Sequence, residues 1–167
     1  MKRIGLLSDT HDFVPERLFF YFEQVDEIWH AGDFGSLALA DRLADFKPLK
    51  GVYGNIDGQD VRTVYPQHQR FYCENVDVWM THIGGYPGRY ERYVKPEIYQ
   101  NPPQLFISGH SHILKVIYDK KLDLLHMNPG AAGYKGFHKV ITALRFVIDG
   151  KNIRDLEVWE IPRNNKF

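Results

Sequence analysis

Five short apolar segments, the first three separated by helix-like stretches, constrain the fold of this chain most strongly. They span residues 4–7, 25–31, 49–53, 76–81 and 105–108. Residues 16–24 and 36–45 lie between the first three, and in the second stretch apolar residues recur at helical spacing behind Ser36, a favourable helix cap. Strands that alternate with helices form parallel pairs, so this half of the chain predicts a mostly parallel sheet.

The last third of the chain predicts a different arrangement. Strand-like segments span residues 113–119, 122–127, 139–148 and 152–161. We expect these strands to be antiparallel, with Asp149-Gly150 as a two-residue hairpin turn. Glycines and prolines interrupt residues 84–103 repeatedly, so a loop with a short helix over 92–99 is expected there. Together the two halves predict an α/β layered domain with two sheets, and the length of 167 residues predicts a single domain, residues 1–167.

The composition argues against two classes of partner. Lys and Arg equal Asp and Glu, 21 each, so the formal net charge is zero and the chain lacks the basic character of a general nucleic-acid binder. The same balance gives no reason to expect binding to an acidic membrane. Cys73 is the single cysteine, which suits a reducing compartment. Too few apolar residues follow Met1-Lys2-Arg3 for a signal peptide or a membrane span, so we expect a cytoplasmic protein.

Each apolar segment ends close to a residue that can bind a metal ion. In sequence order these candidates are Asp9, His11, Asp33, Asn55, His82, His110 and His112. Ligands bind outside the carboxyl ends of the strands in an open α/β sheet, so the five strand ends are expected to bring these side chains together. Asp9 and His11 are two residues apart, as are His110 and His112, and in an extended chain such residues point the same way. Glycines before three of the candidates are expected to let the backbone turn sharply and approach an ion.

The ligand types predict both the number of ions and a reaction. Seven candidates are too many for one tetrahedral zinc with an open position, and they suit two ions that share a bridging carboxylate. The set holds nitrogen and oxygen but no thiolate, which indicates Mn, Fe, Zn, Co or Ni. Two divalent ions bring four positive charges, whereas only Asp9 and Asp33 are anionic, so the centre attracts a phosphate oxyanion. Two ions about 3.5–4 Å apart stabilise the transition state of phosphate hydrolysis and generate the attacking hydroxide.

The motifs and their order resemble those of a known family. They are Ser-Asp-Thr-His at 8–11, Gly-Asp at 32–33, Gly-Asn at 54–55, His82, and Gly-His-Ser-His at 109–112. Together they resemble the calcineurin-like metallophosphoesterase superfamily, and the chain length and the Asn128-Pro129-Gly130 turn resemble its small bacterial and archaeal phosphodiesterase branch. That branch also includes a retromer subunit of the same fold. The motifs run from residue 8 to about residue 133, which is most of the chain.

The resemblance implies a fold and a set of roles. The fold is a four-layer sandwich of two facing mixed β-sheets flanked by helices. The first metal is held by Asp9, His11 and His112, and the second by Asn55, His82 and His110. Asp33 bridges the two ions, and Asp33, Asn55 and His82 take part in catalysis, in which a metal-bridging hydroxide attacks phosphorus in line. Mn is favoured among the metals, the substrate is a small-molecule phosphate ester, a diester rather than a monoester, and a homo-oligomer is compatible with the branch.

Two positions depart from the family pattern. Many relatives carry a catalytic His directly after the metal-binding Asn, but here Ile56 follows Asn55 and Asp57 comes next. The usual acid for the leaving group is therefore absent, which favours esters with good leaving groups, or a proton from water or another residue such as Asp57. Ala131 follows Asn-Pro-Gly at a position where Ser is common among relatives.

Side chains around the seven candidates have two interpretations each. His30 either supports the site by donating to a ligand carboxylate or is an ordinary buried histidine. Tyr86 and Arg89 either form the rim of the substrate site, with Arg holding phosphate and Tyr stacking on a ring, or belong to a solvated loop. No motif supports a role for the remaining histidines His68, His126 and His138, of which the last is expected at the surface.

Two other functions are weighed against the phosphoesterase. The main alternative is a catalytically weak or inactive protein-interaction scaffold of the same fold, which predicts a sizeable exposed apolar patch away from the metals. Seven competent ligand residues favour the enzyme. The third function, a nuclease, needs many Lys and Arg side chains to bind a polyphosphate, so the zero net charge argues against it.

Overall fold

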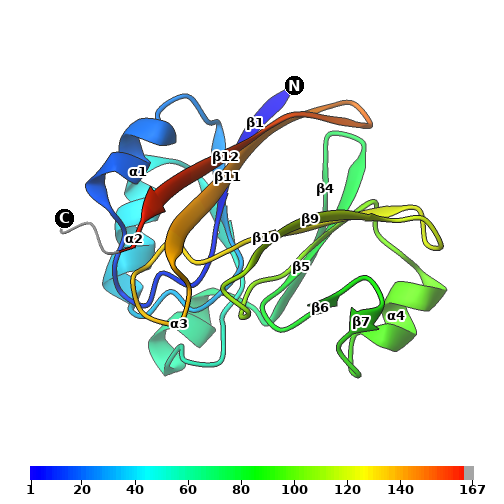
Figure 1. Ribbon diagram of the computed structural model, residues 1–167, viewed down its shortest axis with the longest axis horizontal. Coiled ribbons are helices and arrows are strands. Elements are labelled where there is room, and N and C mark those ends of the chain that lie inside the picture. Colours follow the sequence, from blue (N-terminus) through cyan, green and yellow to red (C-terminus); the bar gives the residue numbers. More distant parts are fainter. Residues whose placement is uncertain (164–167) are drawn as a thin grey trace.

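Two five-stranded sheets face each other, and helices cover their outer faces (Figure 1). The computed structural model describes residues 1–163. The first sheet contains, in spatial order, β12 (Asn152–Pro162), β11 (Val140–Asp149), β1 (Lys2–Leu7), β2 (Glu27–His30) and β3 (Leu49–Gly51). The second contains β4 (His68–Cys73), β5 (Val76–Thr81), β8 (Leu105–Ile107), β10 (Leu124–Pro129) and β9 (Leu114–Asp119). The predicted sandwich of two facing sheets is confirmed.

Both sheets are mixed, as expected. In the first sheet β1, β2 and β3 are parallel, while β11 and β12 run antiparallel to their neighbours. In the second sheet β5, β8 and β10 are parallel, and the two edge strands, β4 and β9, are antiparallel. The parallel strands therefore deliver their carboxyl ends, and the loops that follow them, to common edges of the sandwich.

Apolar side chains from both sheets form the layer between them. Leu6 of β1, Met80 of β5 and Ile107 of β8 are fully buried in this layer. Trp29 is its largest member, and the indole Nε1–H donates to Glu27 Oε2 at 3.0 Å, so its one polar atom is satisfied. Each such side chain contributes roughly 1.5–3 kcal/mol through burial, so this layer is the main source of stability.

Within the described residues 1–163, four short helices lie outside the sheets. α1 (Glu16–Tyr21) and α2 (Leu37–Phe46) pack against the first sheet through Leu18 and Leu43, and the predicted cap is confirmed because Ser36 Oγ accepts from Leu39 N–H at 3.1 Å. α3 (Gln59–Val64) packs beside α2 through Val61. α4 (Lys95–Gln100) covers the second sheet. Within residues 1–163, none of the helices has the length and apolar character that crossing a membrane requires.

Several elements differ from the sequence expectation. β4 and α3 were not predicted, because each buries few side chains and shows no clear apolar period. Residues 84–103 hold a small hairpin, β6 (Gly85–Tyr86) and β7 (Arg89–Tyr90), in addition to the expected short helix. The β11–β12 hairpin is confirmed, but Asp149 pairs with Asn152, so Gly150 and Lys151 form its turn.

Removing apolar volume from the layer between the sheets will test its role. We expect Leu6→Ala to lower the free energy of unfolding by about 2–5 kcal/mol, because the cavity adds to the lost burial. Urea denaturation followed by circular dichroism measures the change. Leu156→Ala, on the half-exposed outer strand β12, is the control and is expected to change stability by less than about 0.5 kcal/mol. Equal effects of the two substitutions would contradict this picture.

Candidate metal centre

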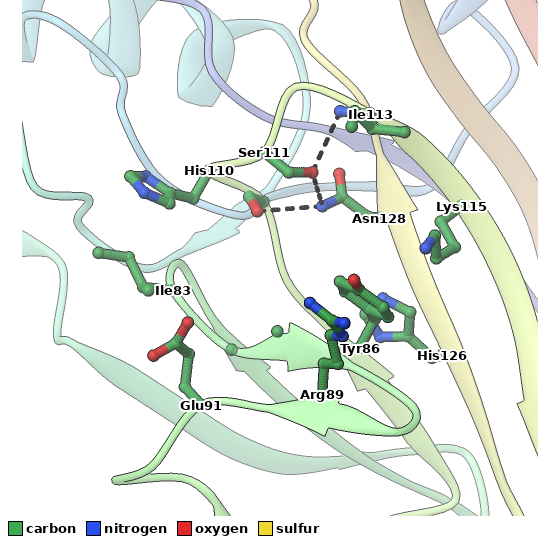
Figure 2. Close-up of a pocket in the computed structure, with 13 residues that line it drawn as sticks. Ile83, Tyr86, Arg89, Glu91, His110, Ser111, Ile113, Lys115, His126 and Asn128 are labelled. Atoms are coloured by element: carbon green, nitrogen blue, oxygen red, sulfur yellow. Dashed lines mark hydrogen bonds between the residues drawn. The ribbon is translucent and has the colours of Figure 1, made fainter.

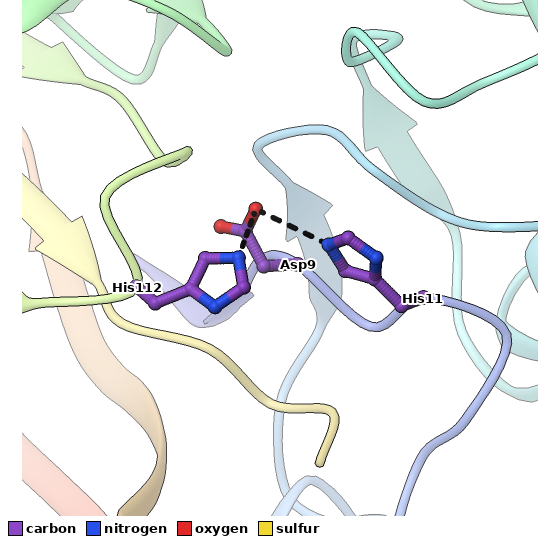
Figure 3. Close-up of side chains that lie close together, drawn as sticks. All are labelled: Asp9, His11 and His112. Atoms are coloured by element: carbon purple, nitrogen blue, oxygen red, sulfur yellow. Dashed lines mark ion pairs between the residues drawn. The ribbon is translucent and has the colours of Figure 1, made fainter. Parts of the chain in front are cut away.

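Loops after four strands, β1, β2, β5 and β8, bring six of the seven candidate ligands into two adjoining groups. The first group is Asp9, His11 and His112, and the second is Asp33, His82 and His110. Within each group the ligand atoms all lie within 4.8 Å of one another. Figure 3 shows His11 and His112 on either side of Asp9, each with a ring nitrogen directed at its carboxylate. We call these six residues and Asn55 the candidate metal centre.

The Asp33 carboxylate connects the two groups. Its Oδ2 lies 3.4 Å from Nε2 of His11, in the first group, and 3.1 Å from Nε2 of His82, in the second. The Asp9 carboxylate also lies near both groups, because its Oδ1 is 3.3 Å from Nε2 of His112, in the first group, and 3.7 Å from Nε2 of His82, in the second. Two carboxylates and their histidines thus enclose one space between the sheets' carboxyl edges.

Three polar atoms that face this space are buried and have no hydrogen-bond partner within residues 1–163. They are Asp9 Oδ1, His11 Nε2 and His82 Nε2. A buried acceptor left unpaired costs roughly 1–3 kcal/mol. Lone pairs of carboxylate oxygen and imidazole nitrogen are the donors that divalent transition metals prefer. The residues present therefore fit the ions that the sequence predicts.

The backbone at the candidate ligands is left-handed, not extended. φ is 53° at Asp9, 45° at His11, 71° at His110 and 63° at His112, and it is also positive at Asp33. The expectation that residues two apart converge through extended chain was therefore wrong. Such φ values are uncommon outside glycine and cost of order 1–3 kcal/mol each, so tight turns, not strand geometry, direct these side chains inward.

Backbone hydrogen bonds hold these turns in place. Asp9 N–H donates to Gly32 O at 2.9 Å, and His11 N–H donates to Asp33 O at 3.1 Å, which locks the first loop onto the second. His110 N–H donates to Asp9 Oδ2 at 3.0 Å, which ties the second sheet to the first. Ser8 Oγ also donates to Asp9 Oδ2 at 2.7 Å, so only Oδ1 is left for an ion.

The three glycines before candidate ligands allow neighbouring side chains of the site to lie directly against the backbone. A Cβ at Gly32 would lie 2.5 Å from the His82 ring, one at Gly54 would lie 2.0 Å from Asp33 Oδ1, and one at Gly109 would lie 2.2 Å from Ser8 Oγ. Only Gly32 has a positive φ, at 104°. At Gly54 and Gly109, glycine is therefore required because any side chain there would collide with a neighbouring side chain, and not because of the backbone conformation.

Two histidine rings are oriented by hydrogen bonds on their far nitrogens. His82 Nδ1 lies 2.7 Å from Ala31 O and donates to it, which leaves the Nε2 lone pair facing the carboxylates. His138 Nε2 donates to Gly133 O at 2.7 Å, so its Nδ1 accepts from His112 Nδ1–H at 3.2 Å. His138 was expected at the surface. The structure instead places it against a candidate ligand, and no local sequence pattern indicated this.

Ion pairing inside the centre controls its titration. Burial would raise the pKa of the Asp33 carboxyl, but His11 and His82 outweigh burial and hold that pKa well below its usual range. Burial opposes a charged His82, yet Asp33 and Asp9 raise its pKa above the ordinary value. The site is thus built to bind positive charge between its carboxylates.

Two supporting residues have contacts other than those expected. His30 Nδ1 accepts from Gly32 N–H at 3.1 Å, so its Nε2 donates to Thr10 Oγ1 at 3.0 Å and not to a ligand carboxylate. Burial lowers the pKa of His30 to about 3 and keeps it neutral. Asp57 accepts backbone N–H groups from Phe34, Gly35 and Gly54 at 3.2, 2.9 and 2.8 Å. Asp57 therefore joins the two loops and is not free to protonate a leaving group.

The last candidate ligand and the expected rim lie in two neighbouring pockets. Asn55 is exposed and, with His82, lines a pocket of about 210 Å³. Tyr86 and Arg89 line a second pocket of about 380 Å³ that borders His110 (Figure 2). We call the latter the hairpin pocket, because β6 and β7 form one of its walls. Of the other histidines, His126 also lines the hairpin pocket.

A substitution at His138 tests whether it orients a candidate ligand. We expect His138→Phe to weaken the binding of one of two divalent ions roughly 10–100-fold, because His112 loses the acceptor that holds its ring. Calorimetric titration of Mn²⁺ into the protein measures both sites. Lys135→Ala, in the same loop but exposed, is the control. Unchanged affinity at both sites in His138→Phe would show that His138 does not position a ligand.

Comparisons with known proteins agree on the family. Residues 1–151 match the sequence model of the calcineurin-like phosphoesterase superfamily domain. A protein of Methanothermobacter thermautotrophicus named "Probable metallophosphoesterase" is 31% identical over 137 residues, which cover 77% of this chain and 76% of that protein. A phosphodiesterase of Methanocaldococcus jannaschii is 26% identical over 149 residues, covering 79% of this chain and 86% of the relative.

Solved structures share the fold. Vps29 of Chaetomium thermophilum has a TM-score of 0.77 at 17% identity, covering 96% of this chain and 97% of that one. A structure described as a novel archaeal phosphodiesterase has a TM-score of 0.69 at 22% identity, covering 94% and 99%. At these identities the likeness concerns the fold alone. The sequence match over residues 1–151 goes further, and with the two groups of candidate metal ligands it leads to one conclusion: the chain belongs to the calcineurin-like phosphoesterase superfamily.

Proposed function

We propose that the chain is a dinuclear metal-dependent phosphoesterase that hydrolyses small phosphodiesters. The observation that carries this proposal is the pair of adjoining ligand groups, joined by Asp33 and containing three buried atoms without partners in the described chain. Asp9, His11 and His112 would hold one ion, and Asn55, His82 and His110 the other. Bound divalent ions activate water and neutralise charge on a phosphate.

The chain's own side chains supply orientation and charge. Asp33 is in reach of a histidine from each group, which supports its proposed bridging role. His82 keeps Nε2 directed inward through its bond to Ala31 O, and Asn55 lies beside it in the same pocket. These three residues are the ones that we propose act in catalysis. Mn²⁺ suits this mixed nitrogen and oxygen ligand set, as do Fe, Zn, Co and Ni.

The loop after Asn55 bears on the choice of substrate. Ile56, which is 45% exposed, offers no proton, and both carboxylate oxygens of Asp57 accept backbone N–H groups. A leaving group that is stable as an anion needs no acid, so esters with good leaving groups are favoured. The name of the Methanocaldococcus relative supports a diester over a monoester. A single domain over residues 1–167 and a cytoplasmic location complete the proposal. The location is supported by Cys73 being the single cysteine of the sequence, which suits a reducing compartment.

A metal-dependent assay tests the proposed function. The protein is stripped of metal, given Mn²⁺, and assayed with bis(4-nitrophenyl) phosphate beside 4-nitrophenyl phosphate. We expect hydrolysis that requires the ion, favours the diester, and falls roughly 100-fold or more in Asp33→Asn, which weakens the proposed bridge while preserving size. Asp41→Asn, exposed on α2, is the matched control and is expected to behave as the unaltered protein.

The same assay separates the second candidate function. A scaffold role is favoured by two observations: the shared fold with Vps29, and the exposed Val116, Ile117 and Tyr118 on edge strand β9. A well-folded protein that hydrolyses neither ester with Mn²⁺, Fe²⁺, Co²⁺, Ni²⁺ or Zn²⁺ would reject the phosphoesterase proposal and favour the scaffold.

A further inference from the structure

The hairpin pocket lies beside the candidate metal centre on the outer side of the second sheet. His110 and Ser111 border it at one end, and Tyr86 and Arg89 of the β6–β7 hairpin form a wall. Lys115 of β9 closes the far side (Figure 2). With a volume of about 380 Å³, the pocket is large enough for an organic group but not for a folded polymer.

Two cations in this pocket have no carboxylate partner in the described part of the chain. Lys115 Nζ lies 3.7 Å from the centre of the Tyr86 ring, and no ion pair involves Lys115 or Arg89. The pocket's one carboxylate, Glu91, lies on the opposite side from Lys115 (Figure 2). The pocket therefore has a positive end remote from His110.

A buried histidine adds an unused acceptor to the same pocket. His126 is fully buried, and its Nδ1 donates to Phe106 O at 3.1 Å. Burial, helped by Lys115, lowers its pKa to about 4, so the ring is neutral. Its Nε2 then presents a lone pair that has no partner within residues 1–163. A buried polar atom without a protein partner is uncommon, and a bound water, ion or ligand group can supply the missing hydrogen bond.

The side-chain amide of Asn128, a further polar group of the pocket, is already engaged. Asn128 Nδ2 donates to Gly109 O at 3.0 Å and to Ser111 Oγ at 3.2 Å, and its Oδ1 accepts from Gly130 N–H at 3.0 Å. These bonds fix the loop that carries His110. The Asn128 amide is therefore not available to a ligand, in contrast to Lys115, Arg89 and His126.

We propose that the hairpin pocket binds the leaving half of the phosphodiester and selects a leaving half that carries a second anionic group, a carboxylate or a phosphate, remote from the scissile phosphorus. Lys115 and Arg89 pair with that anion, and His126 accepts from a hydroxyl or N–H of the same half. This proposal rests on the proposed function. The reaction itself adds water across the P–O bond: the hydroxyl stays on phosphorus, and the departing oxygen leaves as an anion that takes a proton from solvent.

Two matched substrates test the selection. Methyl 4-carboxyphenyl phosphate carries the remote anion, and methyl 4-carbamoylphenyl phosphate replaces it with a neutral amide. The ratio of their kcat/KM values is compared between proteins, so the intrinsic difference between the two phenols cancels. We expect Lys115→Gln and Arg89→Gln each to lower the carboxylate-to-amide ratio about threefold to tenfold, which is the range for a partly solvated ion pair. Arg92→Gln and Lys120→Gln, exposed cations outside the pocket, are expected to leave the ratio unchanged.

A binding measurement keeps this proposal separate from the proposed function. The corresponding benzylphosphonate methyl esters, in which CH₂ replaces the departing oxygen, are not hydrolysed, and their affinity for the metal-loaded protein is measured by calorimetry. Tighter binding of the carboxylate, lost in Lys115→Gln, would support the pocket even if no ester were hydrolysed. Equal binding of both analogues and an unchanged kcat/KM ratio in both pocket variants would overturn the pocket while leaving the phosphoesterase intact.

Discussion

The apolar layer between the two sheets determines where a site can form. Because Leu6 and Trp29 from one sheet pack against Met80 and Ile107 from the other, the two sheets are held at a fixed separation and orientation. The parallel strands of both sheets then end at a common edge of the sandwich. The polar residues that follow these strands are therefore brought close together. The packing of the two sheets thus determines the position of the candidate metal centre. Neither sheet alone carries a complete group of ligands, since His112 comes from the second sheet and Asp9 from the first.

At that edge the structure combines several features that are each unfavourable for the free energy of folding. Five candidate ligands adopt left-handed backbone, three buried polar atoms at this edge lack partners within residues 1–163, and two carboxylates lie within 4 Å of the same His82 nitrogen, at 3.7 and 3.1 Å. Such features persist only where the surrounding structure imposes them, and here backbone bonds from Asp9, His11 and His110 do so. A bound multivalent cation offsets both the missing hydrogen bonds of the buried atoms and the repulsion between the two carboxylates. Ion binding and stability are therefore expected to be closely coupled in this chain.

Much of this arrangement was readable from the sequence, for identifiable reasons. Apolar runs and helical spacing predicted nine of the strands, the first two helices and the two-sheet architecture, because these patterns reflect burial. Residue type at the strand ends predicted which side chains converge. The turns that direct Asp9 and His11 were not predictable, because left-handed backbone in Asp and His leaves no spacing signal. His138 reaches His112 from a loop 26 residues later in the chain, and Asp57 binds backbone groups on another loop, so neither contact has a local pattern. β4 was missed because Cys73 is its one buried residue, so the strand has no apolar run.

The position of β1 in the first sheet has a consequence for synthesis of the chain. This strand is made well before β11, yet one of its edges pairs with β11, where Lys2 opposes Ile148. On the ribosome that edge stays open until β11 has emerged, and an open edge is a template for pairing with other chains. Asp9 directly follows this strand, so its surroundings take their final form only after the C-terminal hairpin docks. β1 is thus translated before β2 to β10 but is paired on both of its edges only after all of them have been made, so rapid docking of β11 shortens the interval in which this edge is open.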